Sequence, residues 1–242
     1  MNLQVRHLMR GRNPDIDSTG ARAAPADLWP APGDVLSYPF PASPLQLEVV
    51  STDANDTFGG TGARLAYVTG LDADWNPVLA PEIIPLAGLT PVPMPSGVSY
   101  IRRTSFMVIA AGSGQRNAGD IILRGQSGGP VLGIIPAGLG IDQSAAQSIA
   151  NGFEASIIDT FVGLQRQAAG WAEVGIEIRD GRQSGAWLMV ASATVNASQT
   201  FVQATPRAIG ASIKAGWDIR LICLSVSGSN IVVSGLMQLA YR

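Results

Sequence analysis

The chain has 242 residues, of which 46% are hydrophobic and only 14% are charged, and its formal net charge at pH 7 is −2. This length provides for one large domain or two small domains, each with its own core. The weak net charge and the lack of a basic run argue against a nucleic-acid-binding role. No stretch approaches the ~20 apolar residues of a membrane span, and the start lacks the apolar core of a signal peptide, so we expect a soluble protein made in the cytoplasm.

The first 44 residues predict an extended arm. They contain prolines at positions 14, 25, 30, 32, 39, 41 and 44. Proline removes a backbone donor and disfavours helix at the preceding residue. An arm of this length usually lies against its own domain or against a neighbouring subunit, and we expect the segment 1–44 to do so.

From residue 45 to residue 130 the sequence alternates short apolar runs with turn residues. The runs at 45–51, 63–71, 99–112 and 119–125 have the composition of strands. The segments between them are rich in Gly, Asp and Asn, which form turns. This pattern predicts a first β-sandwich or small barrel over 45–130.

Two acidic clusters lie in these turns. Asp72, Asp74 and Asn76 have the first spacings of a calcium-binding loop, although the required glycine is missing. The twelfth position of that loop is Ile83 instead of glutamate, which excludes an EF-hand. The second cluster comprises Asp53, Asn55 and Asp56. We interpret both clusters as turns whose short polar side chains bond their own backbone, with a cation at a subunit interface left open.

Aromatic and arginine side chains occur in the turn after the second run and at the start of the third. They are Trp75, Tyr100, Arg102 and Arg103. Such residues are enriched in protein interfaces, but they are also ordinary core and rim residues. The sequence alone leaves both interpretations open.

The stretch 123–133, LRGQSGGPVLG, is one letter away from the box that carries the nucleophilic serine of chymotrypsin-like proteases, with Gln126 in place of the aspartate. Only six residues precede His7, the single histidine, whereas that fold places strands ahead of its histidine base. Lys214 is the only lysine, and the residues after the box do not begin the helix of a nucleophile elbow. We therefore interpret Ser127 as a turn residue where the first sandwich ends, and a serine hydrolase is the weakest hypothesis.

Residues 131–242 resume the pattern of apolar runs and turns. Strand candidates lie at 154–165, 173–180, 184–195, 200–206, 218–226 and 230–241. The window 142–171 contains alanines and glutamines that permit a helix, but Gly152 and the β-branched pair Ile157 and Ile158 favour strand. The sequence predicts a second β-sandwich over 131–242.

Three local features refine this second half. Asp180-Gly181 and Gly228-Ser229 are expected to form hairpin turns. We interpret Cys223, the single cysteine, as a small buried hydrophobe, and a lone cysteine excludes an internal disulfide. The final run has period two, with one face formed by Ile231, Val233, Met237, Leu239 and Tyr241. The fold class predicted from the sequence is all-β, with an extended N-terminal arm and two β-sandwich, jelly-roll-like domains.

Several motifs resemble a family of tailed-bacteriophage virion structural proteins. The most specific are ANDT-x-x-GTGAR at 54–64 and AGSG-x-x-N-x-GDI at 111–121, where x marks an unspecified residue. The similarity extends over IIPAGLGIDQSAAQSIANGFEASI and over the C-terminal strands, and it is weaker in residues 131–190. Phe58-Gly59-Gly60 and the proline-rich PVPMPSG depart from the family pattern.

The resemblance implies a non-enzymatic virion protein, assembled in the host cytoplasm, that needs no cofactor and no metal. The implied role is a capsid decoration or cement protein that bridges capsomers through contacts with the major capsid protein, as a homo-oligomer and most often a trimer. A tail or head-fibre component that touches the host surface is the alternative. The contact elements we expect are the arm 1–44 and the loops 53–62 and 75–95. Neither nucleic acid nor a membrane is an expected partner.

Overall fold

All regular structure in the described residues is β-strand, which confirms the predicted all-β fold class. The computed structural model describes residues 5–17, 19, 23–30, 37–165, 170–183, 185–196, 202–203, 212–229 and 231–242. Within them the window 142–171, for which a helix was the alternative, contains strands. The chain forms two units, Met1–Tyr38 with Ser144–Arg242, and Pro39–Gln143, here called unit 1 and unit 2.

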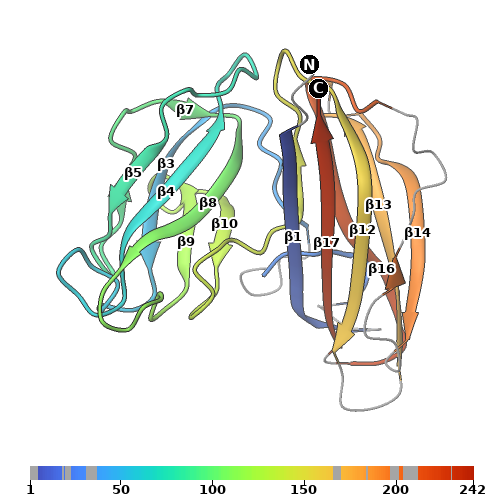
Figure 1. Cartoon of the computed structure of the whole chain (residues 1–242), viewed down its shortest axis with the longest axis horizontal. Coiled ribbons are helices and arrows are strands. Elements are labelled where there is room, and N and C mark those ends of the chain that lie inside the picture. The colour runs from blue at the N-terminus through green and yellow to red at the C-terminus, as the bar shows by residue number, and fades with distance from the viewer. Residues whose placement is uncertain are drawn as a thin grey trace. The chain divides into compact units, whose positions relative to one another are not determined.

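Unit 1 is a sandwich of two antiparallel sheets, drawn with β1, β17 and β12 in front in Figure 1. One sheet has the order β1-β17-β12-β15, and the other has the order β11-β16-β13-β14 with β2 also paired to β16. The strands are β1 (Val5–Ile16), β2 (Ala26–Asp27), β11 (Ala146–Ser148), β12 (Ala155–Gln165), β13 (Trp171–Asp180), β14 (Leu188–Asn196), β15 (Val202–Gln203), β16 (Trp217–Val226) and β17 (Ile231–Tyr241).

The core of unit 1 lies between these sheets and follows from period-two alternation. In β17 the residues Ile231, Val233, Met237 and Leu239 are buried on one face, as predicted. Cys223 on β16 is fully buried in the same core, so its interpretation as a buried hydrophobe is confirmed. Burial raises the pKa of its thiol to about 12, which keeps it unreactive.

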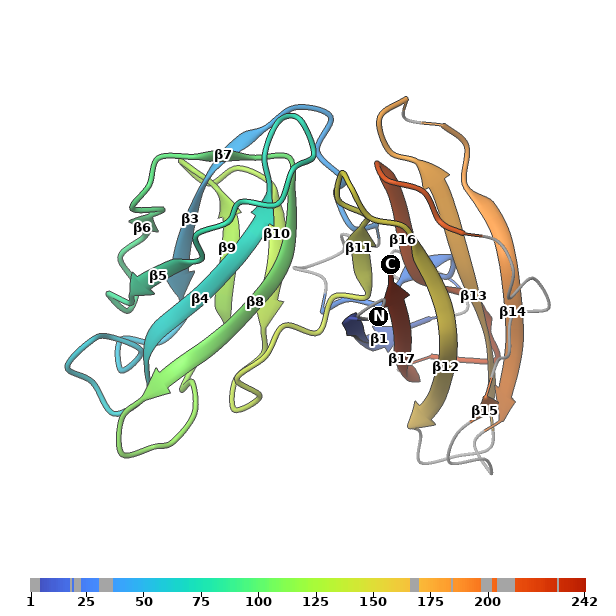
Figure 2. The same cartoon turned by 45° about the horizontal axis from the view of Figure 1, so that its top comes forward.

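Unit 2 also has two sheets, and Figure 2 shows both in a view tilted by 45° from that of Figure 1. One has the order β10-β9-β3-β6 with β7 paired to β3, and the other has the order β5-β4-β8. The strands are β3 (Leu45–Ser51), β4 (Ala63–Leu71), β5 (Glu82–Pro85), β6 (Val92–Pro93), β7 (Ser99–Tyr100), β8 (Arg102–Ala111), β9 (Ile121–Gly125) and β10 (Val131–Ile135). The segment 140–143 bonds to both β8 and β10, through Val108 N–H to Gly140 O and Gln143 N–H to Ile134 O.

The unit boundaries differ from the predicted 1–44, 45–130 and 131–242. Residues 5–16 are not an arm, because they form β1 and pair with β17 from Val5 opposite Tyr241 to Ile16 opposite Ile231. The inward positions of β1 include Gly11 and Asn13 beside Met9, so the strand lacks the apolar alternation that marks strands in a sequence.

The N-terminal segment therefore belongs to the C-terminal sandwich, and unit 2 is an insertion between β2 and β11. The chain leaves unit 1 after Tyr38 and returns at Ser144. Within unit 1 the outgoing and returning segments are neighbours, because Ala145 N–H donates to Leu28 O at 2.9 Å. A Cβ on Gly11 of β1 would lie 2.6 Å from that same Leu28 carbonyl, so only glycine allows β1 to pack here.

Two predicted turns have different outcomes. Asp180 ends β13 and Gly181 begins the turn toward β14, with which β13 forms an antiparallel hairpin, so this prediction is confirmed. Gly228-Ser229 connects β16 to β17, which lie in different sheets, so the predicted hairpin is wrong. Turn residues are the same in a hairpin and in a crossover between sheets, and the sequence does not separate the two.

Candidate functional site

Ser127 lies in a hairpin within unit 2, not in a linker between sandwiches. The segment after β9 turns back into β10, and the two strands pair in one sheet. Ser127 is exposed with a φ of 59°, and its backbone N–H donates to Glu48 Oε2 at 3.3 Å. Glu48 is itself paired with Arg124 at 2.7 Å. His7 belongs to β1 of unit 1.

The two most specific sequence motifs meet at one end of unit 2, around the fully buried carboxylate of Asp56. Asp56 Oδ1 accepts the backbone N–H groups of Ala63 at 2.7 Å and Ala118 at 2.8 Å. Asp56 Oδ2 accepts the hydroxyl of Ser51 at 2.7 Å and the N–H of Gly119 at 2.9 Å. One carboxylate from the first motif thus fixes its own loop and the loop of the second motif.

Asn117 extends this network to the segment after β10. Its amide group donates to the carbonyl oxygens of Gly119 and Pro136, both at 2.8 Å. Its Oδ1 accepts the N–H of Gly140 at 3.0 Å. The loops 51–63, 112–120 and 136–140 are therefore bonded to one another, and the first two lie side by side at the lower left of Figure 1.

These bonded loops display large apolar side chains to solvent. Phe58 is 63% exposed and its N–H donates to Leu86 O at 2.9 Å, while Leu89 in the neighbouring turn is 61% exposed. In the same turn as Leu89, the backbone N–H of Gly88 donates to the backbone carbonyl oxygen of Asp56 at 2.8 Å. The sequence predicted a turn at Asp53–Gly62. It contained no signal that the Asp56 carboxylate bonds Ala118 and Gly119, which lie 62 and 63 positions further along the chain.

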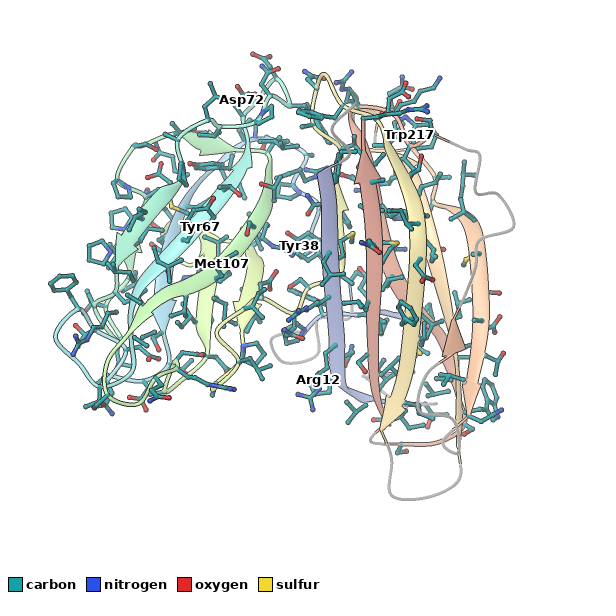
Figure 3. All side chains as sticks on the ribbon, viewed as in Figure 1. Arg12, Tyr38, Tyr67, Asp72, Met107 and Trp217 are labelled. Atoms are coloured by element: carbon teal, nitrogen blue, oxygen red, sulfur yellow. The ribbon has the colours of Figure 1, made fainter. Side chains whose placement is uncertain are left out.

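The outer face of the β5-β4-β8 sheet continues this apolar surface. Pairing places Ile83, Tyr67 and Met107 in one row across the three strands. The next row toward the loops contains Pro85 and Leu65. Figure 3 labels Tyr67 and Met107 on their neighbouring strands. We call the exposed or half-exposed side chains of Phe58, Leu65, Tyr67, Ile83, Pro85, Leu89 and Met107 the apolar surface of unit 2.

The acidic cluster of Asp72, Asp74 and Asn76 is a hairpin tip at the opposite end of the sheet, labelled at Asp72 in Figure 3. Asp72 Oδ1 accepts the N–H groups of Asp74 and Asn76, both at 2.9 Å. This is the local bonding that the sequence predicted for an Asx turn. Among the described residues, no group of three or more His, Cys, Asp and Glu side chains is arranged to hold a metal ion.

The aromatic and arginine residues of 75–103 are internal packing groups. Arg102 lies 4.8 Å from the ring centroid of Trp75, which is 7% exposed, and 5.4 Å from that of Phe40. Tyr100 is fully buried and donates to Glu82 Oε1 at 3.0 Å. Of the two interpretations that the sequence left open, the packing role is the one the structure supports.

Unit 1 contains a nearly buried ionic row on the outer face of its β16 sheet. Arg220 contacts Asp27 at 3.0 Å and Glu177 at 2.7 Å, and its guanidinium lies 4.0 Å from the ring centroid of Trp187. Burial raises the pKa of Asp27 to about 6, against the opposing effect of Arg220. This geometry fits a structural role, since each charge has a partner.

No known protein family matches the chain, and no curated protein matches it. Among solved structures it is similar to one of infectious bursal disease virus, Gx strain, with 12% identity, a TM-score of 0.16, and coverage of 99% of this chain and 77% of that chain. A structure of T=1 particles derived from infectious bursal virus gives 12% identity, a TM-score of 0.15, and coverage of 99% and 74%. Similarity at this level carries no argument about fold or function. No helix in the described part of the chain is long and apolar enough to cross a membrane.

Proposed function

We propose that this chain is a non-enzymatic structural protein of a tailed-bacteriophage virion, and that it serves as a capsid decoration or cement protein. In this role it bridges neighbouring capsomers by binding the major capsid protein, and it acts as a homo-oligomer, for which the sequence resemblance favours a trimer. The observation that carries the proposal is the apolar surface of unit 2, displayed on hydrogen-bonded loops.

The position of the exposed apolar side chains supports this role. Phe58, Leu79, Ile83 and Leu89 are more than half exposed, and all four fall in the loops 53–62 and 75–95 that we expected to make contacts. Exposed aromatic and aliphatic side chains held on a fixed backbone lose little conformational entropy on binding. Many such weak contacts, repeated by the symmetry of a shell, add up to stable attachment.

The geometry around Ser127 favours this proposal over a hydrolase. Its positive φ and its backbone bond to Glu48 are features of a tight turn. A nucleophilic serine requires a base within hydrogen-bonding reach, whereas in this turn Glu48 Oε2 accepts the backbone N–H of Ser127 and Glu48 Oε1 accepts the Nε–H of Arg124.

The test measures occupancy on purified particles. The double variant Phe58→Ser/Leu89→Ser removes two exposed anchors, so we expect the folded protein to lose attachment to the capsid while its unfolding midpoint stays unchanged. Leu139→Ser is the matched control, because Leu139 is 39% exposed in unit 2 but lies outside the expected contact loops.

Mass spectrometry and cryo-electron microscopy of the particles decide among the candidate positions. A copy number in the hundreds on the capsid supports the proposal. A few copies at the tail or on a fibre would replace it with the alternative role, and absence from particles would refute both. Unchanged occupancy of the double variant would show that the apolar surface of unit 2 is not the attachment surface.

A further inference from the structure

Most sheet edges in this protein are protected against pairing with another chain. β1 carries Arg10, Arg12 and Pro14 and has a register shift near its end. β5 is four residues long and ends at Pro85, and the segment 140–143 covers β8 and β10. β2, β6, β7, β11 and β15 are only two or three residues long. Charges, prolines, short length and covering segments are the known means of blocking edge-to-edge pairing.

β14 has none of these protections. It forms one edge of the β11-β16-β13-β14 sheet and lies at the right of unit 1 in Figures 1 and 2. Its sequence, LMVASATVN, contains no charge, no proline and no glycine. Among the described residues, β13 is the strand that pairs with it, and no further backbone bond joins Leu188–Val195 to another segment.

The regular part of this edge is Ala191–Val195. Val190 interrupts the register between β14 and β13, and from Ala191 onward each residue pairs in sequence. Ser192 and Thr194 point to the outer face and are exposed, whereas Val195 is buried in the core. Five residues with small or β-branched side chains thus offer unpaired backbone groups on one side.

We propose that β14 pairs antiparallel with β14 of a second copy of this chain, about a two-fold axis at Ala193. Charge favours a second copy over other partners, because two-fold pairing brings like residues together and an edge without charges suffers no repulsion. Same-face pairing about Ala193 sets Ser192 opposite Thr194 of the other copy. These hydroxyl side chains form a favourable cross-strand pair, and Ala191 meets Val195 on the inner face. The contact joins two sheets into one continuous sheet and does not depend on where the protein sits in a particle.

The two-fold register gives a charge test with a matched control. In Ser192→Lys/Thr194→Lys each new lysine lies directly opposite a lysine of the other copy, so the contact contains two lysine–lysine pairs. In Ser192→Lys/Thr194→Glu each lysine lies opposite a glutamate instead. Both variants alter the same two exposed positions, so their effects on folding of the single chain are comparable.

The readout is the number of chains in each oligomer of the purified full-length protein in solution, from light scattering and native mass spectrometry. We expect an even number in the unaltered protein, which is six if β14 pairs join two of the trimers named under the proposed function, half that number in the lysine–lysine variant, and no change in the lysine–glutamate variant. The lysine–lysine dimer should be roughly tenfold or more weaker. A protein that is monomeric at about 1 mM, where contacts worth ~4 kcal/mol are half-formed, would overturn the proposal. So would an odd number of chains, or equal chain numbers in the two variants.

Discussion

Replacing Asp56 by alanine removes the carboxylate that joins the two most specific motifs. The substitution deletes four acceptor contacts, to Ser51 Oγ and to the N–H groups of Ala63, Ala118 and Gly119. Asp56, Ser51 and Gly119 are buried, whereas Ala118 is exposed and has access to water. The variant therefore leaves two backbone donors, those of Ala63 and Gly119, buried without a partner.

Each buried unsatisfied donor costs about 1–3 kcal/mol, so the variant should lose about 2–6 kcal/mol of unfolding free energy in unit 2. Asp56→Asn retains the Oδ1 acceptor, but its amide group faces the N–H of Gly119, and we expect a smaller loss of about 2 kcal/mol. Asp53→Ala is the matched control. Its Oδ1 accepts two exposed bonds from Asn55, and we expect a loss within about 1 kcal/mol.

Native-state hydrogen exchange measured by mass spectrometry reads the two units separately. Peptides covering β3, β4 and β9 should exchange about 100-fold faster in Asp56→Ala, since about 3 kcal/mol corresponds to that factor. Peptides from β13 and β16 of unit 1 should be unchanged. Exchange of β3 and β4 at the original rate, or an equal effect of Asp53→Ala, would refute the reasoning that Asp56 organises this end of unit 2.

Three further predictions concern unit 1 and the serine turn. Burial raises the pKa of Asp27 from 3.8 to about 6, so the contribution of this group to the stability of unit 1 is largest below pH 4. Unit 1 should lose up to about 3 kcal/mol of unfolding free energy as the pH rises through 6. In urea unfolding, Asp27→Asn should flatten this part of the pH profile, and an unaltered slope would contradict the prediction. Deleting residues 1–16 should unfold unit 1, because β1 pairs along β17 and contributes Met9 and Ile16 to the core; retained exchange protection in β17 would show otherwise. Ser127→Ala should leave biological function intact, and labelling of Ser127 by a serine-reactive probe would revive the hydrolase hypothesis.

Period-two alternation allowed most long strands to be predicted from the sequence. The runs at 45–51 and 63–71 coincide with β3 and β4, and the alternation of the final run matches the buried face of β17. These strands have one face in a core and the other toward solvent, so burial imposes the pattern on the sequence directly. The all-β class follows from the same signal.

The features that the sequence did not yield depend on distant partners. β1 inserts Gly11 where the Leu28 carbonyl approaches and Asn13 where its amide bonds the Asp27 carbonyl, so its inward face is only partly apolar. Asp56 is of a residue type that is common in turns, yet its carboxylate accepts two bonds from the distant residues Ala118 and Gly119. Local composition encodes the turn, whereas the contacts that make it rigid exist only after the sheets have formed.

The insertion of unit 2 into unit 1 separates two kinds of proposed contact. Self-pairing belongs to β14 of unit 1, and attachment belongs to the apolar surface of unit 2, so variants of one surface need not disturb the other. Joining two chains through β14 places two apolar surfaces on one molecule, and the second then binds at a raised effective concentration. Loss of β14 pairing should therefore lower occupancy on particles even though every residue of the attachment surface is retained. The reverse does not hold, because pairing through β14 in solution requires nothing from unit 2.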